Sequence, residues 1–198
     1  DVGCHKGEVL EEMLRYAPNG KHIAFEPIPA MFEDLQDKFG HQVQIHPFAL
    51  SNETGDIEFH HVVTNPAYSG IRKRTYSGDE TVSKIKVKQA RLDDILSPET
   101  PVHVIKIDVE GAEYQVLTGS EQTLMRWKPV VIFENGLGAS DHYGTTPEMI
   151  FQLFDRCGMA INLLDRHLNQ QPALSLEAFQ KQFYERLNYY FVATPKLS

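Results

Sequence analysis

Two acidic side chains and a glycine-containing turn stand at intervals that suit the binding of a nucleotide-like ligand. The chain opens with DVGCHKG, in which Gly3 and Gly7 let backbone N–H groups approach a ligand closely and let a helix begin tightly against it. Glu26, in IAFEPIP, follows Gly7 by 19 residues. At this spacing a carboxylate can accept two charge-assisted hydrogen bonds from the hydroxyls of a ribose. The alternatives are an ordinary strand-to-helix turn and a surface Glu before a proline turn.

The second acidic side chain follows a run of β-branched and aliphatic residues. Asp108 ends the run in VIKIDVEGAEYQVLTG and should emerge at the same edge of a sheet as Glu26, where open α/β sheets bind ligands. Glu110 and Glu113 crowd the same short segment. Three acids so close repel one another unless a cation or helix N-terminal amides compensate. We therefore expect at least one of them to serve only as a helix cap.

The elements that must position these residues alternate along the chain. Apolar periodicity predicts strands at 21–26, 43–50, 102–107, 129–135, 159–165 and 188–194. It predicts helices at about 9–17, 32–39, 112–118, 149–157 and 176–187. This alternation indicates an α/β fold with a mostly parallel sheet covered on both faces, in one domain over residues 1–198.

Residues 55–90 interrupt the alternation. Apolar and polar residues alternate there around Ile57 and Val87, which predicts a two-stranded ribbon. The polar loop 64–82 joins its two strands, and loops of this length are often functional, so we expect a lid over a site. The loop carries the basic triplet Arg72, Lys73 and Arg74, which either recruits an anionic substrate or is simply solvated.

Composition narrows the class of protein. A net charge of −8 over 198 residues argues against broad nucleic-acid binding. The two cysteines, Cys4 and Cys157, indicate reduced thiols rather than a disulfide scaffold. No apolar run approaches the roughly 20 residues that cross a bilayer. These features lead us to expect a cytoplasmic protein that binds neither nucleic acid nor membrane.

Four motifs in this order, DVGxxxG, FEPxP, FALS and IKIDVEGAExxVLxG, resemble the FkbM-type S-adenosylmethionine-dependent methyltransferases over Asp1 to about Glu134. The resemblance implies a Rossmann-like, doubly wound, mostly parallel seven-stranded sheet whose last strand is antiparallel. The first strand of that fold would precede Asp1, so we expect the chain to be a fragment of a longer protein. The implied activity is O-methylation of a hydroxyl on a small molecule or sugar, with S-adenosylmethionine as cofactor.

The resemblance also implies roles for single residues. The amino-acid end of the cofactor would be lined by Asp1, Gly3 and Gly7. Glu26 would hold the ribose, and Asp108 would lie close to the reactive methyl group or the substrate. The adenine would be bordered by Pro27, Ala49 and Leu50.

Methyl transfer to a hydroxyl benefits from a base within hydrogen-bond reach. The candidates are Asp108 on position, His142 because its ordinary pKa lies near neutrality, and Glu134 at the end of VVIFEN. A Mg²⁺ site built from Asp108, Glu110 and Glu134 is the less favoured alternative, and we expect no metal. His142 is equally explained as a solvated loop residue.

Two other functions use similar parts. A nicotinamide-dependent oxidoreductase on a related fold shares the glycine turn and the acidic residue, but its G-x-G-x-x-G motif is broken here by His5. A nucleotide-binding module without catalysis would be expected to lose the acids, yet Glu26 and Asp108 are both present.

Overall fold

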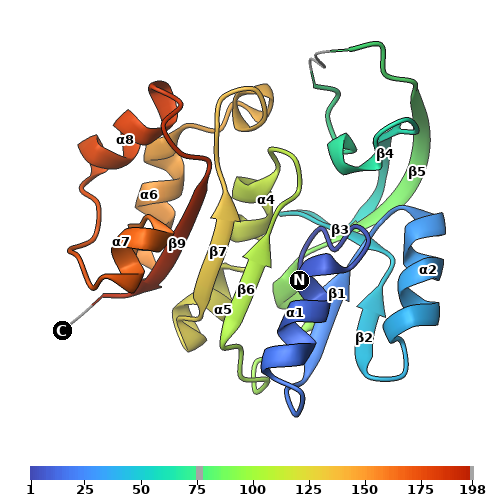
Figure 1. Ribbon diagram of the computed structural model, residues 1–198, viewed down its shortest axis with the longest axis horizontal. Helices are drawn as coiled ribbons and strands as arrows, with labels where there is room; N and C mark the ends of the chain where they lie inside the picture. Colours follow the sequence, from blue (N-terminus) through green and yellow to red (C-terminus); the bar gives the residue numbers. More distant parts are fainter. Residues whose placement is uncertain (75–77, 197–198) are drawn as a thin grey trace.

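A computed structural model describes residues 1–74 and 78–196 (Figure 1). The strands are β1 (His22–Phe25), β2 (Val43–His46), β3 (Phe48–Leu50), β4 (Gly55–Val62), β5 (Val82–Ala90), β6 (Val104–Ile107), β7 (Val130–Glu134), β8 (Met159–Asn162) and β9 (Tyr190–Pro195). The α-helices are α1 (Glu8–Tyr16), α2 (Pro29–Phe39), α3 (Leu92–Ile95), α4 (Glu113–Thr118), α5 (Glu121–Trp127), α6 (Pro147–Arg156), α7 (Leu164–Leu168) and α8 (Leu176–Tyr184). Two 3₁₀ segments, η1 (Pro66–Tyr68) and η2 (Ser140–Tyr143), complete the described elements.

The predicted α/β class is confirmed, with parallel pairing between β1 and β2 and between β6 and β7. The closing strand β9 is antiparallel to both of its neighbours, β7 and β8, as predicted. The described strands form groups of two (β1-β2), three (β3-β5-β4) and four (β6-β7-β9-β8) rather than the single seven-stranded sheet that was expected. The physical reason is that, among the described residues, β-bridges connect the first group to the third through Val2 alone, which is bridged in parallel to Phe25 and Ile107. Figure 1 shows the start of the chain between β1 and β6.

The strand predicted at 43–50 is divided into two. Pro47 separates β2 from β3, and proline has no N–H to donate to a ladder. The two halves then pair with different partners, β2 with β1 and β3 with β5. At this break the chain passes from the β1-β2 group to the group that contains the ribbon strands β4 and β5.

Three short helices, α3, α5 and α7, are absent from the sequence-based prediction because their ends are fixed by distant or local polar contacts. The Asp93 carboxylate of α3 accepts hydrogen bonds from the N–H groups of Gln122 and Thr123, both at 3.0 Å, and so caps the start of α5. The predicted strand 159–165 ends early at Asn162, whose Oδ1 accepts the Leu163 N–H at 3.0 Å just before α7.

Aromatic side chains dominate the main core, which lies among the central strands, α4, α6 and α8. Phe133 on β7 and Phe191 on β9 are fully buried and contact Phe154 of α6 and Phe179 of α8. Burying a side chain of this size contributes about 1.5–3 kcal/mol. In a second cluster, Leu10 of α1 and other apolar residues pack against β1 and β2. These two clusters hold fixed the strand ends that carry the acidic residues.

Strands β4 and β5 form an antiparallel ribbon with Ile57 opposite Val87. Exposed ion pairs join its strands, Lys84 to Glu58 at 2.7 Å and Lys86 to Asp56 at 2.8 Å. In Figure 1 the ribbon rises at the upper right, away from β7 and β9. Residues 75–77 of the predicted lid loop lie outside the described residues.

Cys4 and Cys157 are buried free thiols. Among the described residues, no helix combines the length and apolar character that a membrane span requires.

The end of α4 makes a close contact that tests this packing. A Cβ atom at Gly119 would lie 2.0 Å from the carbonyl oxygen of Ser51, while the φ of −73° at Gly119 is ordinary for any residue. We predict that Gly119→Ala lowers the free energy of unfolding by about 1–3 kcal/mol through overpacking alone. Urea titration measures this. Gly78→Ala is the matched control, because no atom of the described residues other than its chain neighbours lies within 4 Å of its Cβ position; equal losses in both variants would contradict the packing.

Candidate functional site

The opening turn is held between the ends of β1 and β6 by its backbone. Val2 donates its N–H to Lys106 O at 2.9 Å, and its carbonyl accepts the Asp108 N–H at 3.1 Å. On the other side, the Gly3 and Cys4 N–H groups both donate to Phe25 O at 3.2 Å. Gly3 therefore lies between the residues that follow β1 and β6, which are Glu26 and Asp108.

Both glycines of the turn are required, for different reasons. Gly3 has a φ of 72°, and a Cβ there would lie 1.9 Å from the carbonyl oxygen of Asp108. Gly7 has a φ of 87°, and its Cβ would approach the Phe39 ring to 2.6 Å. Gly3 thus permits close approach of the turn to β6. Gly7 permits close packing of α1 on α2.

A cavity lies beside this turn, with about 580 Å³ of empty space when the adjoining open solvent is included. Six of the predicted cofactor-binding residues line it: Gly3, Glu26, Pro27, Ala49, Leu50 and Asp108. Two others, Asp1 and Gly7, are not among the lining residues. The cavity wall also includes Phe59 of β4 and, from the loop after it, Pro66, Ser69 and Ile71. The ribbon region therefore forms one wall of the cavity.

Glu26 is a buried carboxylate, 4% exposed, that is fixed by backbone donors. Its Oε1 accepts the Ile28 N–H and its Oε2 accepts the His5 N–H, both at 2.9 Å. Burial raises the pKa of Glu26 to about 7, although these two hydrogen bonds and the charge of Lys106 oppose the increase. His5 reaches Glu26 from a left-handed conformation with a φ of 51°.

A second group of acids lies at the edge of the cavity, where carboxylate oxygens of Asp108, Glu110 and Glu134 lie within 4.8 Å of one another. Asp108 Oδ2 also accepts the hydroxyl of Tyr190 on β9, at 3.2 Å. Burial raises the pKa of Glu134, and the charges of Asp108 and Glu113 and a hydrogen bond to Asp108 act in the same direction. The structure therefore brings together two of the three predicted base candidates, Asp108 and Glu134.

His142, the third candidate, lies in η2 and is not among the cavity-lining residues. Its carbonyl accepts the guanidinium of Arg72 at 2.9 Å. The structure therefore does not bring the His142 side chain together with the cavity residues, and its contact with Arg72 is made by the backbone.

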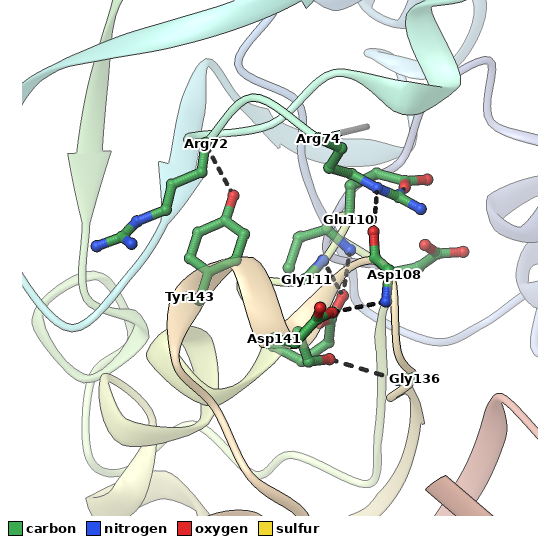
Figure 2. A network of polar contacts seen from close by, with 12 residues as sticks. Arg72, Arg74, Asp108, Glu110, Gly111, Gly136, Asp141 and Tyr143 are labelled. Carbon is green, nitrogen blue, oxygen red and sulfur yellow. Dashed lines mark hydrogen bonds and ion pairs between the residues drawn. The ribbon is translucent and has the colours of Figure 1, made fainter. Parts of the chain in front are cut away.

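The basic triplet joins the ribbon loop to the segment after β7. Figure 2 shows Arg72 and Arg74 reaching Tyr143 and Glu110. The Arg72 N–H donates to the Tyr143 hydroxyl at 2.9 Å, Arg74 pairs with Glu110, and Arg74 Nε donates to Gly138 O at 3.1 Å. Both arginines are engaged within the molecule, whereas Lys73 is exposed.

Among the described residues no side-chain hydrogen bond caps the start of α4, where a helix cap was expected of one acid, and Glu113 instead binds the turn before the helix. Glu113 is 1% exposed, and its Oε1 accepts the N–H groups of Val109 at 3.0 Å and Gly111 at 3.2 Å. Burial raises the pKa of Glu113 to about 7. This side chain stabilises the turn that carries Asp108 and Glu110.

Sequence reasoning missed Lys106 and Tyr190. The Nζ atom of Lys106 donates to Gly3 O at 2.8 Å and lies 3.3 Å from Asp1 Oδ1. The available signal was a lysine inside the apolar run VIKI, because a lysine is rarely buried in a strand unless its charge is paired. Tyr190 gave no comparable signal, because its contact with Asp108 joins residues 82 apart.

Comparison with known proteins gives a consistent result. A family model described as the Methyltransferase FkbM domain matches residues 1–160. The 2-O-methyltransferase NoeI of Sinorhizobium fredii is 26% identical over 144 residues, which cover 64% of this chain and 58% of that protein. The hexuronic acid methyltransferase AglP of Haloferax volcanii is 28% identical over 146 residues, which cover 71% and 55%. The chain thus spans just over half the length of each relative.

Among solved structures, the methyltransferase FkbM from Methylobacillus flagellatus KT superposes with a TM-score of 0.60 at 14% sequence identity. The match covers 98% of this chain and 42% of that chain. At this identity the likeness establishes the fold alone.

The buried acids predict how stability depends on pH. Burial raises the pKa of Glu113 from its ordinary 4.5 to about 7 in the folded state, so its stabilising contribution is complete below pH 4.5 and is lost as the pH rises through 7. Between pH 4.5 and pH 8, we predict that the unfolding free energy of Glu113→Gln falls by about 3 kcal/mol less than that of the unsubstituted protein. Urea titrations at both pH values measure this, with the exposed Glu99→Gln as control. An unchanged pH dependence in Glu113→Gln would contradict the assignment.

Proposed function

The chain belongs to the FkbM methyltransferase family, and on this premise we propose that it transfers a methyl group from S-adenosylmethionine to a hydroxyl oxygen of a small molecule or sugar. The observation that carries the proposal is that Gly3, Glu26 and Asp108, from three separate segments, line one cavity. Each of them follows or adjoins the carboxyl end of a strand, where open α/β sheets bind ligands.

The residues of the cavity fit this cofactor. Each Glu26 oxygen accepts one backbone N–H and keeps further acceptor capacity for the ribose hydroxyls. Pro27, Ala49 and Leu50 offer an apolar border for the adenine. When bound, the cofactor supplies an electrophilic methyl group on a sulfonium. The protein then has to orient the acceptor and take its proton.

We further propose that the first and third groups of strands act as one sheet in the order β2-β1-Val2-β6-β7-β9-β8, with β3, β4 and β5 outside it. Support comes from the parallel bridges of Val2 to Phe25 and Ile107, which align the two groups of strands. In this arrangement Val2 takes the central position. The Gly3 turn then lies at the switch point of the sheet, where a ligand has access from both halves.

Asp108 is proposed as the base that takes the proton of the acceptor hydroxyl, because it lines the cavity and Glu134 does not. Burial and the neighbouring acids raise the pKa of Glu134, which favours the protonated form of Glu134. The Tyr190 hydroxyl donates to Asp108 Oδ2 and orients the carboxylate. A base placed in this way contributes about 10²–10⁴-fold to the rate.

The name of AglP gives its substrate as a hexuronic acid, which favours a sugar acceptor for this chain too. The proposal requires no metal ion. Asp108, Glu110 and Glu134 are close enough to share a divalent cation, but Arg74 already supplies positive charge to Glu110. Isothermal titration with S-adenosylhomocysteine and with NADH separates the proposal from a nicotinamide-dependent oxidoreductase. Binding of NADH alone would overturn it.

The ribose role predicts the effect of a single substitution. Glu26→Ala should weaken binding of S-adenosylhomocysteine by about 1–3 kcal/mol through loss of a charged hydrogen bond. Affinity in the unsubstituted protein should also rise with pH through about 7, because the ionised carboxylate is the better acceptor. Calorimetry at pH 6 and pH 8 measures both effects. Glu58→Ala, on the exposed ribbon, is the control; equal affinity in the Glu26 variant would exclude the role.

The base role predicts a separation of binding from turnover. Asp108→Asn keeps the size of the side chain but removes the proton acceptor, so transfer of labelled methyl to a panel of sugar and uronic-acid acceptors should fall by about 10²–10⁴-fold. Binding of S-adenosylhomocysteine should change by less than about tenfold. Full turnover by this variant would show that Asp108 is not the base, and Glu134 would be the next candidate.

A further inference from the structure

We propose that Lys106 is a positioning residue, whose ammonium fixes the peptide after Gly3 and thereby holds the opening turn and Glu26 in the geometry that receives the cofactor. This inference rests on the proposed function, because the cofactor that it names is the one proposed there. Its evidence is the set of contacts around one buried ammonium, which connects the turn, β6 and Asp108.

Lys106 faces the turn because of its place in β6. Ile105 and Ile107 pack in the main core, so the side chain between them points to the opposite face of the sheet. There its Nζ donates to Gly3 O at 2.8 Å and lies 4.0 Å from Asp108 Oδ2. The side chain is 12% exposed, and it is not among the cavity-lining residues. It therefore acts on the cavity through the turn.

A buried ammonium is costly unless it is paired, and Asp1 supplies the pairing. The Asp1 side chain is 0% exposed, and Oδ1 lies 3.3 Å from Lys106 Nζ. Neither Asp1 carboxylate oxygen has a hydrogen-bond donor among the described residues. Lys106 thus compensates one buried charge and, separately, binds one backbone carbonyl.

The carbonyl contact has consequences along the turn. A peptide unit is planar, so its C=O and its N–H turn together. The unit between Gly3 and Cys4 is held at both ends, its carbonyl by Lys106 and its N–H by Phe25 O at 3.2 Å. The next amide, that of His5, donates to Glu26 Oε2 at 2.9 Å. Release of the carbonyl would therefore loosen the donor that orients the ribose-binding carboxylate.

The two roles of Lys106 can be separated by removing the charge of Asp1 first. The comparison is between Asp1→Asn and the double variant Asp1→Asn, Lys106→Met, in the otherwise complete chain. In this pair no buried carboxylate at position 1 is left uncompensated, so loss of stability from an unpaired charge is avoided. Lys84→Met, at an exposed lysine of the ribbon, controls for removal of a positive charge.

The first readout uses no cofactor. Hydrogen–deuterium exchange at the amides of Gly3, Cys4 and His5 should be about tenfold faster in the double variant than in Asp1→Asn, because one hydrogen bond of the turn is lost. Exchange in α6 and β9 should be unchanged. Equal exchange at the three amides in the two variants would overturn the proposal.

The second readout is affinity for S-adenosylhomocysteine, which should be about tenfold weaker in the double variant than in Asp1→Asn. Equal affinity in the two variants would show that Lys106 compensates charge alone and would also overturn the proposal. Failure of the unsubstituted protein to bind S-adenosylhomocysteine would instead refute the proposed function, while the exchange data would still decide the role of Lys106 in the turn.

Discussion

The backbone hydrogen bonds of Val2 are the constraint on which the rest of the site depends. This residue is bridged to β1 through Phe25 and to β6 through Ile107, so its two flanking residues have little freedom. Because parallel strands end at one edge of a sheet, the bridges bring the residues after β1 and β6 to the same edge. Glu26, Gly3 and Asp108 meet there as a result of backbone pairing, before any side chain contributes.

The second feature of the site is the amount of negative charge that it keeps out of water. Glu26, Glu113 and Glu134 all have raised pKa values because they are buried. Backbone N–H groups and the cations of Lys106 and Arg74 compensate part of this cost. Arg74 comes from the loop of the ribbon, so this loop contributes both a cavity wall and charge compensation. The ribbon is thereby coupled to the central strands through the site itself.

Much of this arrangement was predictable from local sequence. Glu26 and Asp108 both line the cavity. Local sequence indicates their position because each follows a short apolar run, and the carboxyl ends of such strands define a sheet edge. Gly3 lines the same cavity, and a glycine before a helix indicates close approach of backbone. The prediction of one strand at 43–50 was wrong, although the missing N–H of Pro47 was an available signal for the break between β2 and β3.

The remainder depends on contacts between distant segments. Asp93 caps α5 from 30 residues away, and Tyr190 reaches Asp108 across 82 residues. No local pattern encodes such pairs. Gly7 differs from these pairs, because a glycine before a helix is visible in the sequence. Its Cβ position nevertheless faces Phe39, and Gly7 is not among the residues that line the cavity. Sequence periodicity thus located the strand ends, whereas tertiary packing decided which neighbouring residues reach the site.

A crystal structure of the chain with S-adenosylhomocysteine tests the central claim most directly. The account predicts adenosine density in the cavity beside the Gly3 turn, with the ribose hydroxyls on the Glu26 carboxylate and the sulfur nearer Asp108. Ligand density at a different place, or ribose hydroxyls turned away from Glu26, would contradict it.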